Sequence, residues 1–219
     1  MALSKLTYNS LNVTAVANKG IGFDSGADDL STDFAGGAIR FIKKLTASSS
    51  GDLSFVDGTS DVVLDDTYKE YLFIFNNIHG QTDGKRLTFQ GNAAGGSGYN
   101  ETITSTAFRA RHAEDDTETA LGYMAAYDQG QGTSFQAVTF DFGNDNDQSA
   151  SGYMRLFNPS STTFVKHFTA TTNLSSDDNQ SLVGFISGYF NTTSAIDEIQ
   201  FKMDSGNIDA GTISLYGIN

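Results

Sequence analysis

The sequence contains no cysteine and no tryptophan, and it has a single proline among its 219 residues. Without cysteine the chain can form no disulfide, no thiol nucleophile and no Cys-ligated zinc or iron–sulfur site. Positive charge is also scarce: 13 Lys and Arg stand against 26 Asp and Glu, for a net charge of −13. Because such an acidic surface repels nucleic acid and anionic membranes, we expect neither as a partner.

Long apolar runs are missing as well. They reach only five residues, as in Tyr71 to Phe75, far fewer than the roughly 20 apolar residues that cross a bilayer. The stretch from Met1 to Val16 lacks the basic-then-apolar order of a secretory signal. We therefore expect a soluble chain without an export address.

What the sequence does have is a series of short β-prone stretches separated by Gly, Asn, Asp and Ser. This spacing is typical of an all-β sandwich or barrel, and the number of stretches, roughly ten to twelve, suits a jelly roll with extra edge strands. The sequence thus predicts an antiparallel jelly-roll-like β-sandwich. The predicted strands are Ile39–Thr46, Leu53–Val56, Asp61–Leu64, Lys69–Ile78, Leu87–Phe89, Tyr99–Ala110, Gln136–Phe142, Gly152–Phe157, Thr163–Thr171, Leu182–Phe190, Asp197–Met203 and Thr212–Ile218, with Glu114–Ala126 as a loop followed by a strand.

Two turn clusters predict hairpins. Thr82–Lys85 contains Asp-Gly between two apolar stretches, and Asp204–Asn207 joins the last two predicted strands. The strand before the first turn, Lys69–Ile78, is apolar on both faces. Such a strand sits centrally in a sheet, and we expect another segment or another subunit to cover its second face.

The N-terminal residues differ from the rest in composition. Residues 1–38 are rich in glycine and carry only scattered apolar side chains, too few to close a core. We predict an extended N-terminal anchoring arm over residues 1–38 and a jelly-roll-like sandwich over residues 39–219.

Signals for catalysis are weak. The three histidines, His79, His112 and His167, have no metal-binding spacing, and the sequence has neither a nucleophile elbow nor a phosphate loop. The carboxylates stand in adjacent runs, whose side chains point apart on a strand. We therefore predict no enzyme, no cofactor, and no catalytic, cofactor-binding or metal residue.

One loop stays open between two interpretations. Asp141–Asp147 offers several Asx oxygens, the ligands that calcium prefers, yet it lacks the central Gly and terminal Glu of an EF-hand. The alternative is a solvated turn between two strands.

The aromatic residues divide into two groups. Six phenylalanines lie at alternating strand positions and are predicted to be core: Phe41, Phe73, Phe75, Phe140, Phe185 and Phe201. Five tyrosines are freer, and a sugar-binding site built from them is an alternative function: Tyr99, Tyr123, Tyr127, Tyr153 and Tyr189.

Several long segments resemble a known family. The runs Gly152–Phe168 and Gly188–Ile218, the YLFIFNNI segment with its Asp-Gly turn, and the opening Met1–Phe23 are similar to virion structural proteins of tailed bacteriophages, particularly those of marine cyanophages. The resemblance implies a jelly-roll-like particle protein, commonly a homotrimer.

The expected function is a non-enzymatic virion structural protein on the particle exterior. We expect a capsid decoration or cement protein that docks through its N-terminal arm on the major capsid protein or another virion protein. A tail fibre or receptor-binding appendage is one alternative. A carbohydrate-binding, lectin-like module is another, with a host surface glycan as its ligand.

Overall fold

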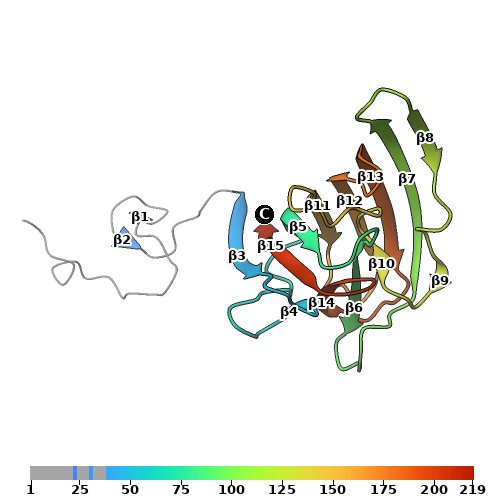
Figure 1. Ribbon diagram of the computed structural model, residues 1–219. Helices are drawn as coiled ribbons and strands as arrows, with labels where there is room; N and C mark the ends of the chain where they lie inside the picture. Colours follow the sequence, from blue (N-terminus) through green and yellow to red (C-terminus); the bar gives the residue numbers. More distant parts are fainter. Residues whose placement is uncertain (1–21, 24–29, 32–37) are drawn as a thin grey trace, which may run out of the picture. The chain divides into compact units, whose positions relative to one another are not determined.

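The structure is a computed structural model that describes residues 22–23, 30–31 and 38–219. The chain divides into two units, Met1–Ala38 and Ile39–Asn219. In the first unit β1 (Gly22–Phe23) pairs antiparallel with β2 (Leu30–Ser31). The rest of the predicted arm, apart from Ala38, lies outside the described residues. The second unit holds every other strand (Figure 1).

The second unit is a sandwich of two antiparallel sheets, as predicted. The larger sheet contains, in spatial order, β3 (Ile39–Thr46), β15 (Ile208–Ile218), β5 (Glu70–Gly80), β11 (Ala150–Phe157), β12 (Lys166–Ser175), β13 (Gln180–Phe190), β7 (Ile103–Ala113) and β8 (Thr119–Tyr123), with β9 (Gly130–Gly132) also paired to β7. The smaller sheet contains β10 (Gln136–Ala137), β6 (Leu87–Ala93), β14 (Ile196–Met203) and β4 (Leu53–Val56). The described residues form no helix, and so none that could cross a membrane.

The strand pairing has the nested order of a jelly roll. β3 pairs with β15, β4 with β14, β5 with β11, and β6 with β10. Along the chain, the first of these eight strands pairs with the last, the second with the second to last, and so on. This is the order of one long hairpin that is rolled up into two sheets. This arrangement agrees with the jelly-roll-like sandwich predicted from the sequence.

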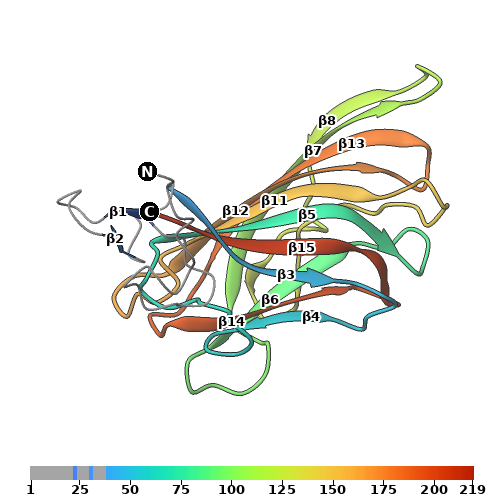
Figure 2. The same ribbon diagram turned by 90° about the vertical axis from the view of Figure 1, so that its left-hand side faces the viewer.

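Two insertions widen the larger sheet beyond the eight-strand plan. β7, β8 and β9 lie between β6 and β10 along the chain, and β12 and β13 lie between β11 and β14. Both insertions add to the same side of β11, so the larger sheet extends as a fan from β3 to β8 (Figure 2). Its inner face continues past the smaller sheet, where Phe140 packs against Gly184 of β13 and covers it.

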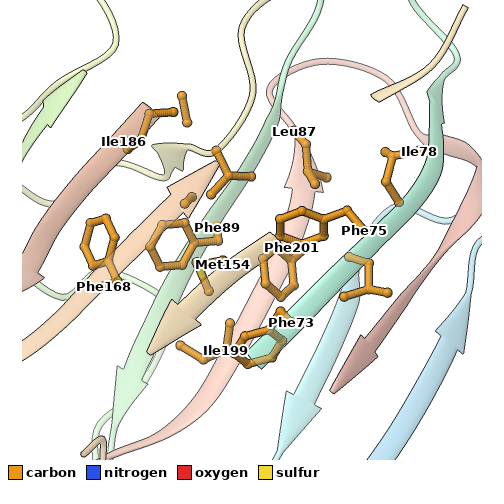
Figure 3. Packing of buried hydrophobic residues seen from close by; sticks show 14 of the residues in the cluster. Phe73, Phe75, Ile78, Leu87, Phe89, Met154, Phe168, Ile186, Ile199 and Phe201 are labelled. Atoms are coloured by element: carbon orange, nitrogen blue, oxygen red, sulfur yellow. The ribbon is translucent and has the colours of Figure 1, made fainter. Parts of the chain in front are cut away.

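The core lies between the sheets and is dominated by phenylalanine (Figure 3). The ring of Phe201 on β14 lies 5.3 Å from that of Phe73 and 5.4 Å from that of Phe75, both on β5. Edge-to-face contacts of this kind add to the free energy of burying the rings. The central position predicted for the Lys69–Ile78 strand is confirmed, because β5 lies between β15 and β11.

The two predicted hairpins are wrong in one respect. The turn Thr82–Lys85 joins β5 of the larger sheet to β6 of the smaller one, and Asp204–Asn207 joins β14 to β15 across the same gap. The turn residues are where the sequence places them, yet each turn is a corner between sheets. The reason is the jelly-roll order, in which strands adjacent in the chain change sheet instead of pairing.

Two predicted strands also differ from the structure: one of them is a loop, and the other is too long. Asp61–Leu64 forms a loop, in which the Leu64 N–H donates to Asp57 Oδ1 at 2.8 Å while the Leu64 side chain is buried. Gln136–Phe142 is a strand only over its first two residues. Apolar residues without a partner strand therefore fill the core as irregular segments. The loop and strand predicted for Glu114–Ala126 are confirmed by the turn before β8 and by β8 itself.

Candidate interaction surface

The outer face of the larger sheet, on the side away from the smaller sheet, carries a row of apolar and aromatic residues. They stand directly opposite one another on six adjacent strands. From β5 to β8 the row is Ile74, Tyr153, Thr171, Phe185, Phe108 and Tyr123. We call these six residues the outer row.

The aromatic members of the outer row are exposed. Phe108 and Phe185 stack with their ring centroids 4.9 Å apart, and their exposed fractions are 44% and 38%. Tyr123 is 57% exposed and Tyr153 is 41% exposed. Stacking of the two phenylalanines shields one side of each ring and leaves the rest in contact with solvent.

Negative charge is nearly missing from this region. Of the 26 Asp and Glu in the chain, Glu70 is the only one within β5, β11, β12, β13, β7 and β8. Its Oε1 lies 3.0 Å from Arg155 Nη1, so the carboxylate is neutralised. A flat surface with aromatic side chains and few charges has the composition of the core of a protein–protein interface.

The predicted core phenylalanines divide between the two faces. Phe73, Phe75, Phe140 and Phe201 are buried, as predicted. Phe41 and Phe185 were predicted to be core and are exposed at 61% and 38%. Alternation along a strand identifies two faces and does not tell which face the second sheet covers.

The five tyrosines do not gather at one end of the sandwich. Tyr123, Tyr153 and Tyr189 lie on the outer face. Tyr99 donates to Glu198 Oε2 at 2.8 Å, and burial together with this bond raises its pKa to about 12. Tyr127 is buried and donates to Asp141 Oδ2 at 2.7 Å. The predicted sugar site is therefore reduced to the three outer tyrosines.

A shallow hollow of about 330 Å³ lies on the outer face beside Tyr189. Gly188 is one of the residues that line it. The ring centroids of His167 and Tyr189 lie 5.8 Å apart at its side. Five serine and threonine residues also line it: Thr104, Ser105, Thr106, Thr169 and Ser187.

Several polar groups of the Asp141–Asp147 loop bond to residues outside it. Asp141 Oδ1 lies 2.9 Å from Arg86 Nε, and the Asn144 amide nitrogen donates to Gln81 O at 3.2 Å. The backbone N–H of Asp145 donates to Gln148 Oε1 at 3.1 Å. Within the part of the chain that the structure describes, no group of three or more His, Asp or Glu is placed to hold a metal ion.

The three histidines lie on three different strands, β5, β7 and β12. His79 Nε2 is 3.3 Å from Asp145 O, and His112 Nε2 is 3.1 Å from Asp116 Oδ1 on the β7–β8 hairpin. His167 lies on the outer face. Asp177 has a raised pKa, because burial and the neighbouring carboxylate of Asp178 both disfavour its charged form.

Comparison with known proteins adds no relative. No protein-family model, no curated protein and no solved structure matches this chain.

Proposed function

We propose that this chain is a non-enzymatic structural protein of a tailed-phage particle, an exterior decoration or cement protein that assembles with copies of itself and attaches to the shell through its N-terminal arm. The observation that carries the proposal is the outer face from β5 to β8, where four exposed aromatic residues lie in one row and the six strands contain a single carboxylate, paired with Arg155, in a chain of net charge −13. Proteins that stay monomeric rarely expose such a surface to water, whereas surfaces that bind another protein commonly have this composition.

The jelly-roll body supports the same role. Its two insertions widen one sheet and leave the nested eight-strand plan intact. They enlarge the flat surface available to a partner. Of the two positions on the particle, we propose the head. A tail fibre or receptor-binding appendage is the alternative position.

The proposal is tested on purified particles whose genome encodes this chain. We expect mass spectrometry to find the chain in many copies per particle, and gold-labelled antibodies against the purified chain to decorate the head. Label on the tail would select the appendage. Absence of the chain from particles, with all of it in the free fraction of the lysate, would overturn the proposal.

A carbohydrate-binding module is the second candidate function, and the hollow at Gly188 is the observation that favours it. Its hydroxyl groups and the adjacent Tyr189 ring are the kinds of group that bind and stack on a sugar. Glycan-array binding by the full chain, lost on changing Tyr189 to Ala and kept on changing Tyr99 to Ala, would support it.

A further inference from the structure

The larger sheet ends in two edges that have no partner strand within the described residues. β8 pairs with β7, and β3 pairs with β15, and each is the last strand on its side. An edge strand presents a row of unpaired backbone N–H and C=O groups. Such an edge readily pairs with another chain unless the sequence prevents it.

β8 has neither the charges, nor the proline, nor the bulge that commonly protect an edge. Its sequence from Thr119 to Tyr123 has no charge and no proline, its ladder with β7 has no bulge, and all five residues are exposed. Leu121 is 76% exposed, the highest value for a large apolar side chain in the described residues. The edges of the smaller sheet, by contrast, are short: β10 has two residues and β4 has four.

The β3 edge is complementary to the β8 edge. Ile39 and Phe41 of β3 are exposed, at 57% and 61%, and the strand also carries three basic residues, Arg40, Lys43 and Lys44, and a bulge in its ladder with β15. The basic residues disfavour pairing with a second basic edge and favour an acidic one. The turn leading into β8 carries four acidic residues, of which Glu118 also pairs with Arg111. They are Glu114, Asp115, Asp116 and Glu118.

The strand directions permit these two edges to meet. All neighbours from β3 to β8 are antiparallel, and the path has eight strands, so β3 and β8 run in opposite directions. A second copy placed beside the first in the same orientation therefore offers its β3 antiparallel to β8. In that arrangement the outer faces of both copies lie on the same side of the joined sheet.

We propose that copies of this chain join head to tail, with the β8 edge of one copy paired antiparallel to the β3 edge of the next. Tyr123 and Leu121 then lie beside Ile39 and Phe41 of the next copy, and the acidic turn lies beside its Lys43 and Lys44. The outer row continues from copy to copy. The contact is heterologous, so the copies close into a ring or continue as a filament, according to the rotation between them.

A twofold pairing of two β8 edges is the competing arrangement. In that arrangement the acidic turn of each copy would lie near Asp128, the residue that follows β8 in the other copy. Negative charges brought together in this way repel one another. Charge thus favours the head-to-tail contact over the twofold one. This inference rests on the proposed function, which places the chain on a phage particle. From that function we also expect the ring to contain three copies.

Disulfide trapping tests the inference directly, because the native chain contains no cysteine. Residues opposite each other on antiparallel strands have Cβ atoms about 4.5–5.5 Å apart, close enough to cross-link. The full chain is made with Leu121→Cys and Phe41→Cys together, and a second variant combines Tyr123→Cys with Ile39→Cys. The controls are the four single variants. Within one copy the two positions lie at opposite ends of the sheet, about 34 Å apart at ~4.8 Å per strand, so they cannot bridge internally.

We expect mild oxidation to convert at least one double variant into covalent multi-copy species on a non-reducing gel, while each single variant runs as one chain. A disulfide dimer of Leu121→Cys alone would show that two β8 edges pair, and would overturn the head-to-tail contact. Absence of cross-linking in every variant, with a monomeric wild-type chain in sedimentation, would also overturn it.

A charged edge gives an independent test. Leu121→Lys places a lysine on β8, the device that natural edges use against pairing. We expect at least a tenfold weaker self-association by sedimentation velocity, with an unchanged melting temperature at monomeric concentration. Phe164→Lys is the matched control, because Phe164 is 69% exposed in the loop between β11 and β12. Equal weakening by both variants would contradict an edge-specific contact.

The two proposals fail in different ways. A chain that is monomeric in solution and abundant on particles would refute the head-to-tail contact and leave the particle role intact. A chain that forms rings and is absent from particles would refute the particle role and leave the contact intact.

Discussion

The inner and outer faces of the larger sheet are made by the same strands, yet the inner face is apolar and buried, whereas the outer face mixes exposed aromatic residues with hydroxyl-bearing ones. On the inner face Phe73, Met154, Ala170, Ile186 and Ala107 lie opposite one another, and each is at most 3% exposed. The outer row lies one residue away on each strand and has the same cross-strand pairing, but the smaller sheet does not cover it. Antiparallel sheets usually place polar residues on such a second face. The exposed aromatic residues of the outer row depart from this rule, which is why we propose that the outer face contacts a partner, while the inner face supplies the stability.

The largest effect that tests this comparison is expected at Phe201. Its ring contacts those of Phe55, Phe73, Phe75 and Phe89 between the sheets. Changing Phe201 to Ala removes a fully buried ring and leaves a cavity, which costs about 3–5 kcal/mol of unfolding free energy. Urea denaturation followed by circular dichroism measures the loss.

Phe108→Ala on the outer face is the matched control. Its ring is partly exposed and stacks on Phe185, so we expect a loss of about 1 kcal/mol or less under conditions where the chain is monomeric. Losses of similar size for Phe108→Ala and Phe201→Ala in the monomer would show that both faces stabilise the fold, and the comparison would fail.

A smaller and pH-dependent effect is expected at Tyr127, on the covered side of the sheet. Burial first, and then its hydrogen bond to Asp141, raise the pKa of Tyr127 to about 12. An unfolded tyrosine titrates near pH 10. Between these values the unfolded chain loses the proton and the folded chain keeps it, so the stability that this hydroxyl contributes is lost as the pH rises.

We therefore expect Tyr127→Phe to cost about 1 kcal/mol at pH 8, the value of a lost hydrogen bond. The difference from the wild-type chain should shrink steadily above pH 10. Urea unfolding at pH 8 and pH 11 checks this prediction. A difference of equal size at both pH values would show that the Tyr127 hydroxyl has the same pKa in the folded and unfolded chains.

The sequence was enough to predict the fold class, because alternating short stretches and turn residues are local signals. It could not give the pairing. The turns at Thr82–Lys85 and Asp204–Asn207 have the residues of hairpins and join different sheets. Which strand pairs with which depends on the nested order of the whole chain, and no single turn encodes that order. Val62 and Leu64 show the same limit of sequence-based prediction, because both side chains are buried although they belong to a loop and not to a strand.

The candidate surface could be predicted only in part. The two-sided apolar pattern of Tyr71–Phe75 correctly predicted a central strand, and the expected cover of its second face by another segment or subunit stays a prediction. Phe185 and Phe41 gave the same alternating signal as the core phenylalanines, and they lie on the open side. Whether a face is covered depends on how far the smaller sheet and the 138–142 segment reach, which is a property of the packed structure. Scarcity of Asp and Glu in six strands was a signal available in the sequence, and it identifies the outer face once the strands are assigned to one sheet.

The smallest effect concerns the Glu70–Arg155 ion pair. The strength of this pair reports whether water has access to the outer face. In the isolated chain Arg155 is 46% exposed at its side chain, so water and salt screen the pair. A double-mutant cycle with Glu70→Gln and Arg155→Met should give a coupling of about 0.5 kcal/mol or less that vanishes in 0.5 M salt. If a partner covers the face, the same pair loses its water and the coupling grows. We therefore expect a larger coupling in the self-associated chain than in the monomeric Leu121→Lys background. Equal couplings in the two states would mean that association leaves this part of the outer face open, so the edges would be the contact and the face would be free for another partner.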